Sequence, residues 1–147
     1  MGVKVKVLQI DCSTSESVPK RVERVLGLID QQAPDCEFML LPELWNVGAF
    51  DLEASREHAQ PIDGALPTAL ARKARERGIW LHGGSFCEKD GADLHNTSVL
   101  FNPQGELAAY YRKVHVFTYA REQDTMTPGK NYVMVETPLG LTGLATC

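Results

Sequence analysis

Residues 97–117 have the sequence TSVLFNPQGELAAYYRKVHVF, which is typical of a β-hairpin. The first arm, residues 97–102, is mostly apolar and contains β-branched side chains, as strands prefer. Residues 102–105 place proline second and glycine fourth, the arrangement that favours a type I turn. Residues 107–117 then return as the partner strand, so the sequence predicts two antiparallel strands joined by a tight turn.

Lys113 lies in the second of these predicted strands. Side chains alternate between the two faces of a strand, so Lys113 would share a face with His115 and Phe117. An ammonium group beside an aromatic ring has two explanations: the lysine stem follows apolar surface outward to water, or the charge is held inside a functional site. From this segment alone the first explanation is favoured, because lysine is rarely buried.

The first 41 residues have the pattern of a βαβ unit. Valine alternates with lysine over residues 3–7, apolar side chains repeat at helical spacing over residues 18–33, and residues 36–41 form a short run dominated by apolar side chains. Such a run is typical of a strand covered on both faces. The order strand, helix, strand normally belongs to a parallel sheet, so the expected fold class is α/β.

A long connection, a helix and a strand are predicted next. Residues 46–61 form a polar connection that is longer than usual and is therefore a candidate for lining a site. Asp63 would cap a helix that ends at Gly78. Residues 79–82 would form a strand leading into the Gly-Gly-Ser sequence at residues 83–85.

The last third of the chain outside the hairpin contains a charged turn and two strands. Residues 88–93 are predicted to form the turn. Its charged side chains and the nearby histidine could be proposed as metal ligands, but a solvated loop is the favoured interpretation of Glu88, Asp90, Asp93 and His95. Strands are predicted over residues 132–136 and 141–147. Because the sequence stops inside an apolar strand, we expect residues 1–147 to be the N-terminal part of a single domain.

Composition argues against several functional classes. The 147 residues carry a net charge of -4 with a pI near 5.5, which disfavours a nucleic-acid-binding surface. No apolar run approaches the length that crosses a membrane. Without a secretory signal or metal-type spacing, the four cysteines are expected to be reduced thiols in a cytoplasmic protein: Cys12, Cys36, Cys87 and Cys147.

Three residues are predicted to lie where α/β enzymes carry their chemistry. Glu43 follows the carboxyl end of a predicted buried strand, the edge at which open α/β sheets place their sites. Lys113 is on the hairpin, and Cys147 ends the last predicted strand. Taken singly, each has a simpler structural explanation: a solvated carboxylate, an exposed lysine and an inert buried thiol.

Taken together, four spaced motifs resemble the carbon–nitrogen hydrolase (nitrilase) superfamily. They are LPEL at residues 41–44, GGS at residues 83–85 with Asn96, YRKVHVF at residues 111–117 and GLATC at residues 143–147. The similarity also covers residues 122–129, which begin with a second glutamate that the family keeps beside its lysine. Two features depart from the family pattern: Thr146 replaces an aliphatic residue, and the Tyr-Asp pair that normally follows the cysteine is absent.

The resemblance implies a four-layer αββα sandwich, of which this chain would supply about half. It also implies a catalytic triad of Glu43, Lys113 and Cys147, supported by Glu122. The Cys147 thiolate would attack a small carboxamide and form a thioester, while Glu43 transfers protons and Lys113 stabilises the oxyanion. This chemistry releases ammonia and needs no metal or organic cofactor, and the family commonly forms homodimers or larger homo-oligomers.

Three other interpretations stay open from the sequence. A nitrilase or an N-carbamoyl amide hydrolase would use the same triad on a different substrate. A non-catalytic α/β binding scaffold would keep the fold without turnover. A nucleotide-binding domain has the least support, because residues 83–85 lack the GxGxxG and GKS patterns of phosphate-binding loops.

Overall fold

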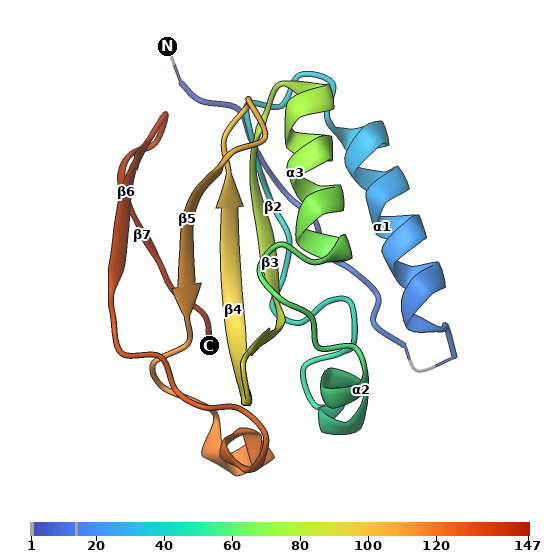
Figure 1. The fold of residues 1–147 in the computed structure, drawn as a ribbon. Helices are drawn as coiled ribbons and strands as arrows, with labels where there is room; N and C mark the ends of the chain where they lie inside the picture. The colour runs from blue at the N-terminus through green and yellow to red at the C-terminus, as the bar shows by residue number, and fades with distance from the viewer. Residues whose placement is uncertain (1, 14) are drawn as a thin grey trace.

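A five-stranded sheet forms the centre of the computed structural model, which describes residues 2–13 and 15–147 (Figure 1). Its strands are β1 (Val5–Val7), β2 (Phe38–Leu40), β3 (Trp80–Asp90), β4 (Asp93–Phe101) and β5 (Leu107–Arg112), in that spatial order. The first three strands are parallel, and β4 and β5 extend the sheet antiparallel to their neighbours. The predicted βαβ unit and its parallel sheet are therefore confirmed.

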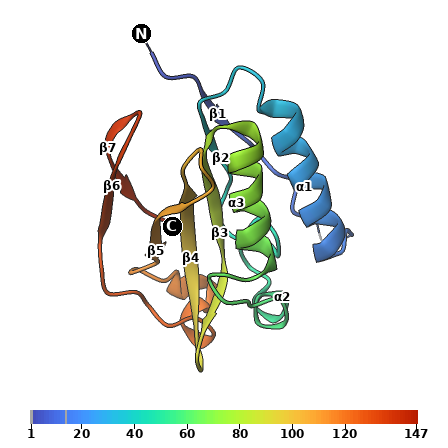
Figure 2. The same ribbon diagram turned by 45° about the horizontal axis from the view of Figure 1, so that its top comes forward.

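Two helices cover one face of this sheet. They are α1 (Val18–Gln32) and α3 (Ala65–Arg77), which lie side by side in both ribbon views (Figures 1 and 2). Each turns an apolar stripe inward, so that Ile29 of α1 and Leu70 of α3 become buried against the sheet in one apolar cluster. Burial of these stripes removes apolar surface from water and is the main force holding the layers together.

A second, two-stranded sheet lies on the other side of the five-stranded sheet. Figure 2 shows this hairpin, β6 (Val133–Thr137) and β7 (Gly140–Leu144), on the side opposite to the helices. A second apolar cluster fills the space between the two sheets and includes Leu144, Leu100 and Tyr111. The chain thus supplies three successive layers, helices, sheet and hairpin, and the predicted α/β class is confirmed.

The predicted charged turn at residues 88–93 is wrong. Strand β3 continues through Asp90, and only Gly91 and Ala92 separate it from β4. Glu88 therefore lies within a strand, with 3% of its surface exposed. A strand can hold this carboxylate because the guanidinium of Arg112 on β5 neutralises it at 2.7 Å.

Helix α3 ends as predicted but begins differently. Gly78 closes it in the left-handed conformation with φ of +63°, which glycine adopts readily. Gly64, and not Asp63, occupies the N-cap position, so the predicted cap is wrong. The side-chain oxygen of Gln60 takes over that function, accepting a hydrogen bond from Leu66 N at 2.7 Å.

The long connection at residues 46–61 has structure of its own. It contains the short helix α2 (Leu52–Glu57), whose first turn is capped by the Asp51 carboxylate accepting from Ala54 N. Within residues 2–13 and 15–147, no helix combines the length and the apolar character needed to cross a membrane.

Candidate active site

Lys113 is buried between two carboxylates. Its Nζ donates a hydrogen bond to Glu43 Oε1 at 2.8 Å and another to Glu122 Oε2 at 2.8 Å. The lysine side chain is 2% exposed, and the side chains of Glu43 and Glu122 are 20% and 5% exposed. The explanation of Lys113 as a lysine that extends to solvent is therefore wrong, and three of the four residues predicted to form the site meet at one place.

The backbone around Lys113 also differs from the prediction. Strand β5 ends at Arg112, so Lys113, His115 and Phe117 do not form one face of a continuing strand. Lys113 N still donates to Asn96 O at 2.9 Å, which ties the residue to β4. After this point the chain turns away from the sheet, and Phe117 N donates to Glu122 Oε2 at 2.6 Å.

The Gly-Gly-Ser sequence at residues 83–85 supports the turn that carries Glu43. Leu44, next to the glutamate, has φ of +44°, and its N–H donates to Ser85 Oγ at 3.1 Å. Gly84 has φ of +67°, and a Cβ built on it would lie 2.0 Å from the carbonyl oxygen of Pro42. Only glycine fits at this approach. These residues therefore hold a strained turn in place and do not form a phosphate-binding loop.

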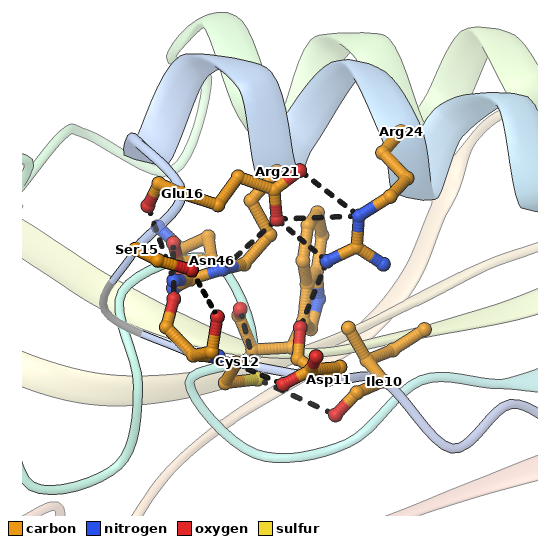
Figure 3. Close-up of polar contacts among 10 residues, drawn as sticks. Ile10, Asp11, Cys12, Ser15, Glu16, Arg21, Arg24 and Asn46 are labelled. Atoms are coloured by element: carbon orange, nitrogen blue, oxygen red, sulfur yellow. Dashed lines mark hydrogen bonds and ion pairs between the residues drawn. The ribbon is translucent and has the colours of Figure 1, made fainter.

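A buried arginine fixes the chain on the other side of Glu43. Figure 3 shows the guanidinium of Arg21, a helix α1 residue with 2% exposure, among backbone carbonyls and the Glu16 carboxylate. Its Nη1 donates a hydrogen bond to Asn46 O at 3.0 Å. In the loop before α1, Cys12 Sγ donates to Trp45 O at 3.3 Å. Residues immediately after the Glu43 turn are thus tied to α1 and to the loop before it. The charged residue on the inward side of a predicted helix was the only sequence signal for this contact.

Asn96 is the residue of the site whose role the sequence did not predict. The family resemblance includes Asn96 together with the Gly-Gly-Ser sequence at residues 83–85 but assigns it no function. In the structure its Nδ2 donates to Glu43 Oε1 at 2.7 Å and to Glu122 Oε1 at 2.8 Å. The side chain is 1% exposed. A polar amide within the buried part of a strand was the available sequence signal.

The charges of the site stabilise one another. Burial alone would lower the pKa of Lys113, but the hydrogen bonds to Glu122 and Glu43 outweigh it and raise the pKa above its ordinary value. Burial alone would raise the pKa of Glu122, but hydrogen bonds from Asn96, Lys113 and the Phe117 amide outweigh it and lower the pKa. At neutral pH the site therefore holds an ammonium ion beside an ionised Glu122.

Cys147, the remaining residue of the predicted triad, is exposed and follows the last strand. Strand β7 ends at Leu144, so Cys147 lies three residues beyond the strand that it was predicted to end, and its side chain is exposed. In both ribbon views the C-terminus lies beside β5, the strand that leads to Lys113 (Figures 1 and 2). Among residues 2–13 and 15–147, no hydrogen bond or ion pair joins Cys147 to Glu43 or Lys113.

The other three cysteines have different environments. All four are free thiols; Cys36 and Cys87 are buried and Cys12 is half-buried. Burial raises the pKa of each of these three thiols, that of Cys87 to about 11. A raised pKa disfavours the thiolate, the form that acts as a nucleophile. Within residues 2–13 and 15–147, which contain all four cysteines, Cys147 is the exposed thiol.

Two of the candidate metal-ligating residues, Glu88 and Asp90, form an ion-pair network with Arg112. Arg112 makes a bidentate contact with Glu88, with Nη2 2.7 Å from Oε1 and Nε 2.8 Å from Oε2, and Thr97 Oγ1 donates to Oε2 at 2.6 Å. Asp90 accepts from Arg112 at 2.8 Å. Within the part of the chain that the structure describes, no group of three or more potential ligands is arranged to hold a metal ion. The interpretation as a solvated loop is wrong for Glu88 and His95, which are buried, whereas Asp90 and Asp93 are exposed.

Comparison with known proteins places this site in context. The family model described as carbon-nitrogen hydrolase matches residues 4–147. The 2-oxoglutaramate amidase of Paenarthrobacter nicotinovorans is 30% identical over 97% of this chain and 51% of its own length. Human omega-amidase NIT2 is 31% identical over 98% of this chain and 54% of its own length.

Solved structures agree with this result. Saccharomyces cerevisiae Nit3, a member of branch 10 of the nitrilase superfamily, superposes with a TM-score of 0.85 at 27% identity, over 99% of this chain and 55% of that protein. An amidase from Nesterenkonia shares the fold with a TM-score of 0.84 at 19% identity, over 99% of this chain and 55% of that protein. The chain spans about half the length of the curated relatives it matches. From the match over residues 4–147 and these relatives, the chain belongs to the carbon–nitrogen hydrolase family and has an amidase-type hydrolase fold.

Proposed function

We propose that the chain carries the catalytic groups of an amidase that hydrolyses the non-peptide C–N bond of a small carboxamide through a thioester on Cys147. The observation that carries this proposal is the ammonium of Lys113, 2.8 Å from each of two carboxylates and almost fully buried. Burying one cation with two anions carries a desolvation penalty, and buried charged groups of this kind cluster at functional sites.

In this mechanism Glu43 removes the proton from the Cys147 thiol. The thiolate forms a bond to the carbonyl carbon, and the negative charge moves to the carbonyl oxygen. When that intermediate collapses, the C–N bond breaks and the nitrogen leaves as ammonia with the proton from Glu43. Glu43 then deprotonates a water molecule, which attacks the thioester. The C–S bond breaks, the carboxylic acid is released, and the proton returns from Glu43 to the Cys147 thiolate.

Lys113 stabilises the oxyanion in both tetrahedral intermediates. A charged donor aimed at that oxygen typically contributes about 3–4 kcal/mol to transition-state stability. Glu122 holds the ammonium in position, because both of its oxygens are occupied by hydrogen bonds and its side chain is 5% exposed. Glu43 is the more accessible carboxylate, at 20% exposure, which suits it to exchange protons with substrate and water.

The names of the relatives suggest which substrate class to test first. One is a 2-oxoglutaramate amidase and several are omega-amidases, so we propose the terminal carboxamide of a small oxo acid as the first substrate class to test. We also propose that the active protein is a cytoplasmic homo-oligomer; four free thiols agree with a reducing compartment. No step of the mechanism calls for a metal or an organic cofactor.

The test is ammonia release by the purified protein from a panel of carboxamides, nitriles and N-carbamoyl amines. Cys147→Ala should abolish turnover, whereas Cys12→Ala, the matched control at a half-buried thiol, should retain it. Mass spectrometry of the enzyme during turnover should find the acyl group on Cys147. Substantial ammonia release by Cys147→Ala would overturn the assignment of the nucleophile. Turnover of nitriles alone would replace the amidase with a nitrilase, and binding without turnover would favour a scaffold.

A further inference from the structure

Asn96 completes a closed ring of hydrogen bonds with the three charged side chains of the site. Lys113 Nζ joins Glu43 Oε1 to Glu122 Oε2, and Asn96 Nδ2 joins the same Glu43 oxygen to Glu122 Oε1. Two donors thus bridge the two carboxylates: the charged ammonium of Lys113 and the neutral amide of Asn96. The ring is buried, with Asn96 1% and Lys113 2% exposed.

The ring divides the two oxygens of Glu43 into different roles. Oε1 accepts two hydrogen bonds, at 2.7 and 2.8 Å, whereas Oε2 has no protein donor among residues 2–13 and 15–147. A carboxylate oxygen offers about two lone-pair directions, so Oε1 is fully used. Glu122 differs, because Oε1 accepts from Asn96 and Oε2 accepts from Lys113 and the Phe117 amide. Only Glu43 therefore keeps an oxygen available for a proton.

The orientation of the Asn96 amide leaves its oxygen, Oδ1, without a hydrogen bond among the described residues, which costs desolvation free energy. Its Oδ1 is buried without a hydrogen-bond partner within the described part of the chain. Rotating the amide by half a turn would satisfy nothing, since it would point Oδ1 at the two carboxylates and repel both. Native proteins rarely leave a buried acceptor unsatisfied, and such sites commonly reflect a functional requirement.

We propose that Asn96 is a positioning residue that fixes the carboxylate of Glu43 so that Oε2 is the atom that exchanges protons with the thiol, the leaving ammonia and water. This inference rests on the proposed amidase mechanism. An amide suits the position because its N–H groups orient both carboxylates without adding charge. A second ammonium would bind Glu43 too strongly for a base, and a third carboxylate would repel it.

The test compares Asn96→Ser with Thr97→Val. Serine is too short to bridge both carboxylates. Thr97 is the next residue on β4, equally buried, and its hydroxyl donates to Glu88, away from the site. Thr97→Val thus removes one buried hydrogen bond to a carboxylate from the same strand without touching Glu43.

Two measurements on each variant distinguish positioning from stability. Carbon-13 NMR at pH 7, with the Glu43 carboxyl assigned by comparison with Glu43→Gln, should show a changed chemical shift of that carboxyl in Asn96→Ser, because the carboxylate loses a hydrogen-bond donor. In steady-state kinetics kcat of Asn96→Ser should fall about 10-fold or more with KM little changed. Thr97→Val should leave the Glu43 chemical shift, kcat and KM close to their native values.

Each outcome has a defined meaning. An unchanged Glu43 carboxyl chemical shift in Asn96→Ser, or an equal change in Thr97→Val, would overturn the positioning role. If Asn96→Ser fails to fold, Asn96→Asp keeps the shape of the side chain and should change the Glu43 chemical shift and lower kcat, because it replaces a donor with a third carboxylate. Loss of the fold in both Asn96 variants with Thr97→Val intact would assign the residue to folding and overturn the proposal. A changed Glu43 chemical shift in Asn96→Ser, in a protein that releases no ammonia from any amide, would refute the amidase mechanism and leave the hydrogen-bond assignment standing.

Discussion

Replacing Lys113 with methionine tests the buried ammonium most directly. Methionine fills a similar volume and removes the charge, so the carboxylates of Glu43 and Glu122 would face each other across the site without a cation. In the native structure each lies 2.8 Å from Nζ. The substitution therefore separates the electrostatic role of the lysine from its packing role.

The expected loss of stability follows from burial. Removing one partner of a buried ion pair costs about 3–5 kcal/mol, because the remaining charge is left uncompensated. We expect about 3 kcal/mol, the lower end, because water reaches Glu43, which is 20% exposed. Domains of this size have unfolding free energies of roughly 5–15 kcal/mol, so the variant should remain folded at 25 °C. The value of kcat should fall by about 10²-fold or more, because the oxyanion loses its charged donor.

Urea unfolding at pH 7 and steady-state ammonia release measure the two effects separately. Adding Glu122→Gln to Lys113→Met removes one of the uncompensated charges, so the double variant should recover part of the stability and none of the activity. Lys113→Arg should not restore kcat, because a planar guanidinium does not occupy the place of a point charge. A kcat within a few-fold of the native value, or a stability loss below about 1 kcal/mol, would refute the assignment of a buried catalytic ammonium.

The pH dependence of stability provides an independent check. The pKa of Lys113 is raised above its ordinary value of 10.5, so its contribution is full below that pH and is lost as pH rises through the folded-state pKa. The pKa of Glu122 is lowered below 4.5, so its contribution is full above that pH and is lost as pH falls through the folded-state pKa. Lys113→Met should lack the alkaline loss of stability.

Two further predictions concern residues that support the site. Gly84→Ala should destabilise the protein by about 2 kcal/mol or more and lower kcat, because the new Cβ would lie 2.0 Å from Pro42 O. Gly91→Ala is the control, since Gly91 also has a positive φ of +61° but its Cβ would have no atom within 4 Å. It should lower the free energy of unfolding by only about 1 kcal/mol and leave kcat unchanged. Glu88→Gln should cost roughly 1–3 kcal/mol at pH 7 in urea unfolding, because it breaks the ion pair with the partly exposed Arg112. Burial opposes but does not overcome the effect of Arg112 in lowering the Glu88 pKa, so this contribution is full above pH 4.5 and the difference from the native protein should shrink as pH falls further. An equal effect of the two glycine substitutions, or a Glu88→Gln difference that grows in acid, would contradict these explanations.

The sequence by itself determined the elements whose patterns are local. Apolar spacing over residues 18–33 predicted α1 to within one residue of its end at Gln32, and the glycine at position 78 marked the end of α3. The Pro-Gly turn at residues 102–105 predicted the β4–β5 hairpin, in which Gly105 N donates to Asn102 O at 2.9 Å. Helix periodicity, glycine stops and turn residues act within a few residues of the chain, so one sequence contains them completely.

The resemblance of the spaced motifs to a known family indicated which residues would meet. It implies a site that contains Glu43, Lys113 and Glu122, and the structure brings these three together. The resemblance also implies Cys147 as the nucleophile, and that role stays a prediction.

Only the tertiary structure decided the state of each charged group. The hairpin segment alone favoured an exposed Lys113, but two carboxylates from distant segments replace its water and allow it to be buried. Glu88 was expected in a solvated turn, but the guanidinium of Arg112, two strands away, offsets the desolvation penalty of the buried carboxylate. The hydrogen bonds of Asn96 likewise depend on two carboxylates that are 53 and 26 residues away in sequence. Burial and pairing of charge depend on partners brought together by the whole fold, and no local pattern in the sequence encodes that distance.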